Sequence, residues 1–202
     1  MSNEHLSAAA AIVVTFVLFA PYIRSIRRGD TRPHVFTWVV WAIGTLTVFV
    51  AQLAGGAGLG AWPIGISGLI TSYVAFLAYD RRGDTAVTRV DWAFLVAAMS
   101  ALPLWFLTAD PLWAVVTLTV VDLLGFGPTV RKAYGQPREE HAGLFALSAL
   151  RNALVVAALE RHTLTAVLFP AAVGLACLLL VVMLLWRRTV LGTVKQVGAA
   201  AA

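Results

Sequence analysis

The chain contains two copies of one pattern, separated by a constant offset of 107 residues. Shifting residues 19–82 by this offset, without a gap, places distinctive residues of the first copy on identical residues of the second. Phe19, Pro21, Arg24, His34, Pro63 and Arg81 fall on Phe126, Pro128, Arg131, His141, Pro170 and Arg188. A repeat at a fixed offset is a signal of the fold. The sequence therefore predicts two units with similar folds.

Both copies lie in apolar sequence, which predicts membrane spans. Of the 202 residues, 60% are hydrophobic and only 12% are charged, and the mean hydropathy is +0.84. A helix that crosses the hydrocarbon region needs about 20 mostly apolar residues. Seven stretches of this kind can be placed, at 8–26, 35–54, 61–79, 92–109, 112–131, 142–159 and 164–186. We therefore predict an all-α membrane protein with seven transmembrane helices, whose function lies within the helices or at their ends.

The distribution of basic residues predicts the orientation of the chain. Thirteen of the 15 Lys and Arg residues fall in the loops after the first, third and fifth spans, at the span ends beside these loops, or in the C-terminal segment. Because cytoplasmic loops collect Lys and Arg, we expect the N-terminus outside and the C-terminus in the cytoplasm, in a bacterial inner membrane. This topology accounts for the pI of about 10, so we expect the lipid bilayer and no nucleic acid as a partner.

The fourth span gives the two copies the same orientation. A unit of three spans ends on the side opposite its start, so a second copy would be inverted unless one extra span came between them. We expect a first three-helix repeat at 1–82, a linker with the fourth helix at 83–111, a second repeat at 112–189 and a cytoplasmic tail at 190–202. Transporters built from parallel repeats bind their substrates between the repeats, near the bilayer midplane.

This arrangement resembles the SWEET and PQ-loop superfamily. Three spans, a linker span and three more spans are its topology, and a proline lies near the cytoplasmic end of the first span of each repeat, at Pro21 and Pro128. The family's Pro-Gln pair is Pro-Tyr and Pro-Thr here. The superfamily includes sugar transporters, lysosomal amino-acid exporters and the related KDEL receptors, so the resemblance implies a carrier. The segments 32–38 and 149–152 are more similar to an uncharacterised bacterial branch, for which the resemblance supplies no function.

Two charged residues lie deep inside the predicted spans, Asp122 in the fifth and Arg151 in the sixth. At 1.5 Å per residue, Asp122 lies about 15 Å from the outer end of its span, and Arg151 lies about 15 Å from the cytoplasmic end of its span. Such residues cost at least about 2.5 to 3.5 kcal/mol at the middle of a span, which makes them candidates for function. An Asp122–Arg151 pair could bind a carboxylate or a phosphate through the guanidinium, while Asp122 releases the arginine or takes a proton. The same pair could equally be a structural tie between the two helices.

Three further residues complete the predicted substrate-binding site. Asn152 and its repeat counterpart Thr45 lie near the midplane, and Trp41 shares a helical face with Thr45. An aromatic ring beside an arginine suits a planar or anionic organic ligand. The alternative is ordinary packing for the tryptophan and an intrahelical hydrogen bond for the threonine.

The histidines and prolines of the repeat are candidates for moving parts. His34 and His141 occupy equivalent positions at the cytoplasmic entry to the second and sixth spans, where they could form a gate or a pH sensor. The alternative is an interfacial position without a switch. Pro21 and Pro128 could act as hinges, because a proline inside a helix removes a backbone hydrogen bond.

Motifs of other functional classes are missing. The sequence has no zinc-ligand spacing, Gly-rich phosphate loop or nucleophile elbow, so we expect no metal, no cofactor and no catalytic residue. We predict a carrier of a small polar or anionic organic solute, with coupling to protons left open, and not an enzyme. The alternatives are a ligand-binding or scaffolding protein of the same fold and, third, an intramembrane enzyme. Gly56 and Gly60 form a GxxxG pattern, which leaves a homo-oligomer open.

Overall fold

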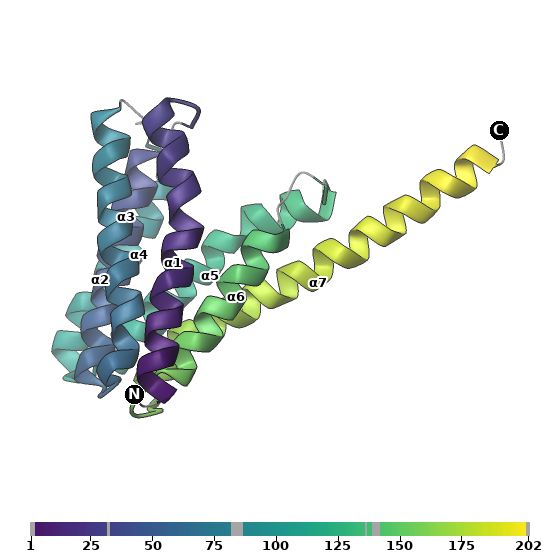
Figure 1. The fold of residues 1–202 in the computed structure, drawn as a ribbon. Coiled ribbons are helices and arrows are strands. Elements are labelled where there is room, and N and C mark those ends of the chain that lie inside the picture. The colour runs from purple at the N-terminus through teal and green to yellow at the C-terminus, as the bar shows by residue number, and fades with distance from the viewer. Residues whose placement is uncertain (1–2, 32, 82–86, 136, 139–141, 201–202) are drawn as a thin grey trace.

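The computed structural model consists of helices, and it describes residues 3–31, 33–81, 87–135, 137–138 and 142–200 (Figure 1). Within these ranges the chain forms seven α-helices and one short 3₁₀-helix. They are α1 (Asn3–Arg28), α2 (Val35–Ala54), η1 (Gly58–Ala61), α3 (Trp62–Asp80), α4 (Arg89–Thr108), α5 (Leu112–Gly135), α6 (Ala142–Ala157) and α7 (Leu164–Ala200). Each predicted span coincides with one α-helix, which confirms the all-α architecture. Helix α7 continues through residues 190–200, the segment expected as a tail.

Local sequence signals set the helix ends. Helix α4 begins at a capping box, in which the Asp91 N–H donates to Thr88 Oγ1 and the Thr88 N–H donates to the Asp91 carboxylate. Pro63 lies in the first turn of α3, where its missing N–H is not needed. Gly29 follows α1 with a φ of 85°, a left-handed conformation that glycine adopts readily.

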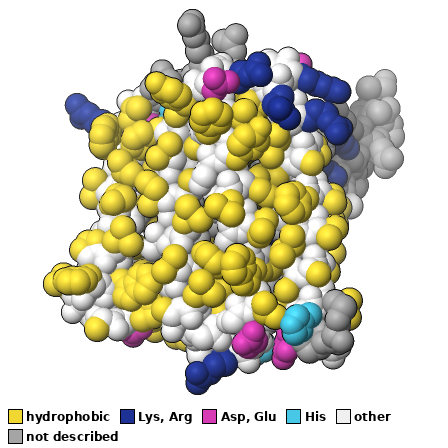
Figure 2. Space-filling view, turned by 60° about the vertical axis from the view of Figure 1, so that its left-hand side comes forward, with side chains coloured by type: hydrophobic (Ala, Val, Ile, Leu, Met, Phe, Trp, Pro, Cys, Tyr) yellow, Lys and Arg dark blue, Asp and Glu magenta, His cyan; other side chains and the backbone are white. Residues whose placement is uncertain are grey.

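The surface of the bundle is apolar along its middle. Large hydrophobic side chains such as Val13, Leu107 and Leu179 are exposed, and Figure 2 shows hydrophobic side chains covering the middle of one face. Six helices are long and apolar enough to cross a membrane, whereas the described part of α6 has 16 residues and is shorter. These features identify a multi-pass membrane protein, because the exposure of so large an apolar surface to water is unfavourable.

The helices pack as two sets of three with α4 beside them. Helix α3 packs against both α1 and α2, and α7 packs against both α5 and α6. The two sets meet where α1 contacts α6 and where α2 contacts α5 and α7. Helix α4 packs mainly against α5 and also contacts α2. We call α1–α3 the first half and α5–α7 the second half.

The two ends of the bundle differ in how the halves meet. At one end, which we call the basic end, α1 and α3 finish and α2 and α4 begin; it carries Arg24, Arg27, Arg28, Arg81 and Arg89. Toward this end α5, α6 and α7 lean away from α1, α2 and α3 (Figure 1). At the other end, which we call the joined end, the connections of residues 55–61 and 158–163 lie together.

The hydrophobic clusters follow the same division. The largest cluster is shared by all seven helices and includes Ala11, Val48, Val115 and Phe169. A second cluster at the joined end combines Ala57 and Ala61 with Leu159 and Ala166. Toward the basic end each half has its own cluster. That of the first half contains Ile26, Val74 and Leu77, and that of the second half contains Ala133, Leu180 and Leu184.

Candidate functional site

Arg151 is buried between the halves and bonded to the first half. Its Nε donates to Thr15 Oγ1 of α1 over 3.1 Å, and its Nη2 donates to the Pro63 carbonyl of α3 over 2.9 Å. Its Nη1 donates to Asn152 Oδ1 over 3.5 Å. The side chain is 8% exposed, so this is a set of hydrogen bonds in an apolar interior. Arg151 therefore ties α6 to α1 and α3.

Asn152 lies on the other side of the same helix, against α7. Its Nδ2 donates to the Ser148 carbonyl one turn earlier, over 2.8 Å, and the residue is 2% exposed. A Cβ at Gly174 would lie 3.0 Å from the Asn152 Cβ, so the glycine allows α7 to approach. Asn152 packs between helices and does not line the cavities described below.

Asp122 and Arg151 do not form the ion pair that the sequence suggested. Among the described residues, the one salt bridge joins the exposed side chains of Arg81 and Asp80. Helix α7 packs against both α5 and α6 and separates Asp122 from Arg151, with Cys177 of α7 within electrostatic range of both. The equal depth of the two residues stays a prediction, and depth along a helix does not determine which helices are neighbours.

Asp122 instead shares a small cavity with Trp41 and Thr45. The cavity has a volume of about 20 Å³ and lies among α2, α4, α5 and α7. Its lining is Val40, Trp41, Gly44, Thr45, Ala98, Leu118, Val121, Asp122 and Phe169. A cavity of this size holds about one water molecule if it has polar partners. Three of the five predicted binding residues are thus brought together, and Arg151 and Asn152 are not among them.

The polar groups of this cavity have no protein partner within the described part of the chain. The Asp122 carboxylate has no Lys, Arg or His nitrogen within 4.0 Å there and accepts no hydrogen bond. The Thr45 hydroxyl makes no hydrogen bond to the described residues either, whereas Thr47 on the same helix donates to the Ile43 carbonyl over 2.8 Å. The intrahelical bond proposed as the alternative for Thr45 is therefore not formed. Both groups are available to a ligand or to water.

A larger pocket continues from this cavity toward the basic end. It has a volume of about 430 Å³ and is lined by α2, α4 and α5. Val40, Trp41 and Val121 line both the pocket and the cavity, and Asp91 is the acidic residue of the larger one. Pockets of 300 to 1,000 Å³ with mostly apolar walls and a few polar groups are typical of small-molecule sites. The Trp41 ring is held edge-on by Trp38, at 5.2 Å between ring centroids.

The other predicted residues have structural positions. His34 caps α2, where its Nδ1 accepts from the Thr37 N–H over 3.3 Å and lies 2.7 Å from Thr37 Oγ1. His141 lies outside the described residues, so a pairing of the two histidines stays a prediction. Pro21 and Pro128 lie inside the helices α1 and α5, as hinges would. Among the described residues, no three His, Cys, Asp or Glu side chains form a group that could hold a metal ion.

Gly44 is a residue of the cavity that the sequence-based prediction missed. It lines the cavity opposite Asp122, and a Cβ there would lie 3.3 Å from Leu118 Cδ2. The signal was present in the repeat, because Gly44 is the counterpart of Arg151 and Thr15 is the counterpart of Asp122. Glycine lacks a functional group, so a search for chemistry-bearing side chains passes over it.

Comparison with protein-family models, with curated proteins and with solved structures found no match for this chain. The resemblance to the SWEET and PQ-loop superfamily stays a prediction from the sequence.

Proposed function

We propose that the protein is a membrane carrier of a small organic solute, which binds between the halves beside Asp122. One observation carries this proposal. A carboxylate at the middle of a span faces a cavity and has no partner among the described residues, at the closed end of a pocket large enough for a metabolite. An unpaired charge in an apolar interior is costly unless it takes a proton or meets a cation. An ionisable residue inside a span is therefore a candidate binding site for a solute or an ion.

The packing of the halves supports a carrier built from two parallel repeats. Within each half the third helix lies between the other two, and the contacts of α1 with α6 and of α2 with α5 are exchanged by the 107-residue offset. The clusters at the basic end correspond as well: Ile26, Leu77 and Trp38 of the first match Ala133, Leu184 and Phe145 of the second. A carrier with this symmetry holds its site at the interface of the repeats.

The same symmetry accounts for the cavity. At one interface Thr15 meets Arg151, whose long side chain fills the space. At the equivalent interface Asp122 meets Gly44, which has no side chain, and a cavity is left. The interface of Thr15 and Arg151 therefore holds the halves together, and the interface of Asp122 and Gly44 is the proposed binding site.

The polar groups that line the cavity favour a different kind of solute from the one that the sequence suggested. The sequence suggested a small polar or anionic solute, because an arginine was expected beside the site. Arg151 donates to Thr15, Pro63 and Asn152 and does not line the cavity, which offers a carboxylate, a hydroxyl and an aromatic ring. These groups suit a polar solute with an amine, whose cation would pair with Asp122 and contact the Trp41 ring. In the absence of the solute a proton on Asp122 would neutralise the site.

The difference between the two ends supports alternating access. The halves are bonded together at the joined end and have separate hydrophobic clusters at the basic end. We propose that the basic end faces the cytoplasm of a bacterium, as the distribution of Lys and Arg predicts. The structure then represents a state that opens inward. Rocking of the halves about the joined end, with bending of α1 and α5 at Pro21 and Pro128, would close the basic end.

The proposal can be tested by ligand-induced stabilisation followed by transport. The detergent-solubilised protein is unfolded thermally in the presence of small polar metabolites, with and without amine groups, at pH 5.5 and 7.5. A solute that binds only the folded protein raises its apparent stability, by about 2.7 kcal/mol at 100 times Kd. We expect stabilisation of the wild type by an amine-bearing solute, and none of Asp122→Asn.

A matched variant and a flux assay separate the carrier from its alternatives. Asp30→Asn makes the same chemical change in an exposed loop and should respond as the wild type does. The stabilising solute should then cross proteoliposomes, and Gly44→Ala should slow it, because the added methyl group fills the cavity. A solute that binds but does not cross would support a ligand-binding protein instead. Stabilisation that persists in Asp122→Asn would place the site elsewhere.

A further inference from the structure

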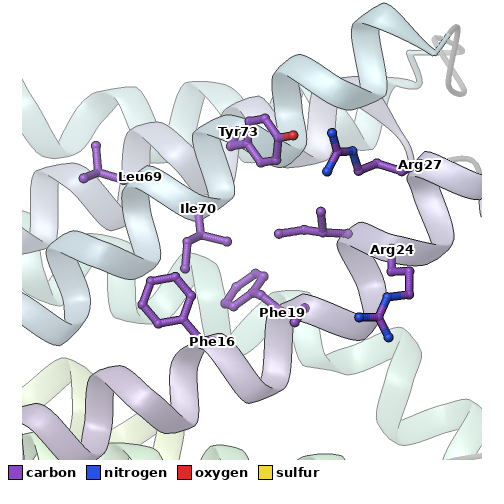
Figure 3. A pocket seen from close by; sticks show the side chains of 9 residues that line it. Phe16, Phe19, Arg24, Arg27, Leu69, Ile70 and Tyr73 are labelled. Atoms are coloured by element: carbon purple, nitrogen blue, oxygen red, sulfur yellow. The ribbon is translucent and has the colours of Figure 1, made fainter.

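A second pocket lies on the outside of the first half, between α1 and α3 (Figure 3). It has a volume of about 510 Å³, and both helices belong to the same half, so it is separate from the proposed solute site. We call it the α1–α3 groove. It is lined by Phe16, Phe19, Ala20, Ile23, Arg24, Arg27, Leu69, Ile70 and Tyr73. Seven of these residues are hydrophobic, and the two others are arginines.

The polar and apolar residues of the groove are segregated along its length. Phe16, Leu69 and Ile70 lie at one end, and Arg24 and Arg27 lie at the other (Figure 3). The Tyr73 ring lies between them, with its hydroxyl toward Arg27. From Phe16 to Arg27 the groove follows 11 residues of α1, or about 16 Å at 1.5 Å per residue. The hydrocarbon core of a bilayer is about 30 Å thick, so one leaflet is about 15 Å deep. The groove thus extends from the membrane surface to the midplane.

Arg24 and Arg27 are not neutralised by the described part of the protein. Both side chains are exposed, and neither forms an ion pair or a hydrogen bond with any residue in that part of the chain. They lie one turn apart on α1, at the same end of the groove. In Figure 3 the Arg27 guanidinium lies beside the Tyr73 hydroxyl, and the Arg24 side chain lies on the other side of α1. Two such guanidinium groups at the top of an apolar channel suit an anion that is attached to a hydrocarbon chain.

We propose that the α1–α3 groove binds one anionic phospholipid of the surrounding bilayer. Arg24 and Arg27 hold the headgroup phosphate, and Tyr73 provides a further donor beside it. One acyl chain lies along Phe16, Ile23 and Ile70 and reaches the middle of the membrane. Basic pockets between transmembrane helices on the cytoplasmic side recognise anionic headgroups by these charges. A zwitterionic lipid offers the same chain but carries a compensating positive charge, so it should bind less tightly.

Native mass spectrometry of the full-length protein can measure this binding. The detergent-solubilised protein is titrated with phosphatidylglycerol and, separately, with phosphatidylcholine of the same acyl chains. We expect tighter binding of phosphatidylglycerol, and a loss of roughly tenfold in its affinity in the double variant R24Q/R27Q. The control R28Q/R89Q removes two exposed arginines of the same end that do not line the groove, and it should retain the wild-type affinity.

A second pair of variants tests the apolar part of the groove without a change in charge. Leu69→Trp places an indole in the channel and should weaken phosphatidylglycerol binding several-fold. Val13→Trp adds the same ring to an exposed position of α1 that does not line the groove and should have no effect. Equal binding of the two lipids would overturn the proposal, as would an equal loss in R28Q/R89Q. Displacement of the lipid by glycerol phosphate at equal concentration would show a site for a free anion instead.

Discussion

The joined end and the basic end of the bundle contain the same kinds of helix but hold the halves together very differently. At the joined end the Leu59 N–H donates to Glu160 Oε1 over 3.0 Å, Thr163 Oγ1 donates to the Gly55 carbonyl over 2.9 Å, and Gln52 Nε2 donates to the Ala166 carbonyl over 2.8 Å. At the basic end the described side-chain bonds stay within one half, as in Arg188 Nε to the Pro137 carbonyl. Among the described residues, the hydrogen bonds between the halves therefore lie at the joined end and at Arg151.

The space around the glycines also differs between the joined end and the basic end. A Cβ at Gly60, at the joined end, would lie 2.7 Å from the Leu159 backbone, and a Cβ at Gly55 would lie 2.9 Å from the Thr165 Cβ. At Gly125, Gly127, Gly135 and Gly143, all toward the basic end of the second half, an added Cβ would have no described atom within 4 Å beyond its own helix backbone and its chain neighbours. Close backbone approach at one end and open space at the other is the arrangement that allows the halves to rock about the joined end.

The largest loss of stability is expected from Arg151→Ala. The change removes the tie from α6 to α1 and α3, leaves the Pro63 carbonyl and the Thr15 hydroxyl without Arg151, and opens a cavity. Lost hydrogen bonds and a cavity together should cost about 3 to 4 kcal/mol. Thermal unfolding in detergent measures the effect. The contrasting variant is Asp122→Asn, which should be as stable as the wild type or more so, because it removes a buried charge. Equal destabilisation by both changes would mean that the two residues act as a pair.

Gly60→Ala should lower the free energy of unfolding by about 2 kcal/mol, because it disrupts the packing at the joined end. The new methyl group meets backbone atoms of Leu159, which cannot move aside as a flexible side chain can. The matched variant is Gly143→Ala in α6, where the methyl group meets open space and the greater helix propensity of alanine should be neutral or slightly stabilising. Thermal unfolding of the two variants compares the ends directly. A similar loss of stability in both would show that the ends are equally constrained.

The helices and their number were predictable because apolar runs and turn residues are local signals. The residues at the interface were only partly predictable. Periodicity placed Trp41 and Thr45 on one face, and the repeat placed Thr15 and Gly44 at positions equivalent to Asp122 and Arg151. The spacing could not show that α7 separates α5 from α6, since neighbours in the sequence need not be neighbours in a bundle. The assumption that opposite charges at equal depth would pair was therefore wrong.

Motion should be confined to the basic end if the halves rock. In a Cys177→Ser background, spin labels at Tyr79 of α3 and Tyr134 of α5 report the separation of the halves at the basic end, since both side chains are exposed. Labels at Leu53 and Leu164 report the joined end in the same way. We expect a broad distance distribution for the first pair, which narrows or shifts with a bound solute, and a narrow one for the second. Equal widths at the two ends would contradict a hinge at the joined end.

The smallest expected effect is that of Glu160, whose carboxylate is exposed and accepts one backbone N–H from Leu59. Glu160→Leu removes the acceptor and should lower the free energy of local opening at the joined end by about 1 kcal/mol. Glu160→Gln keeps an acceptor oxygen in the same place and should cost less. Amide hydrogen exchange of Leu59 measures this locally, since about 1 kcal/mol corresponds to about a fivefold faster exchange. The Glu160 N–H also donates to the Ala57 carbonyl over 3.2 Å, a bond that neither change removes. Exchange that stays at the wild-type rate in both variants would show that this backbone bond, and not the side chain, holds the joined end closed.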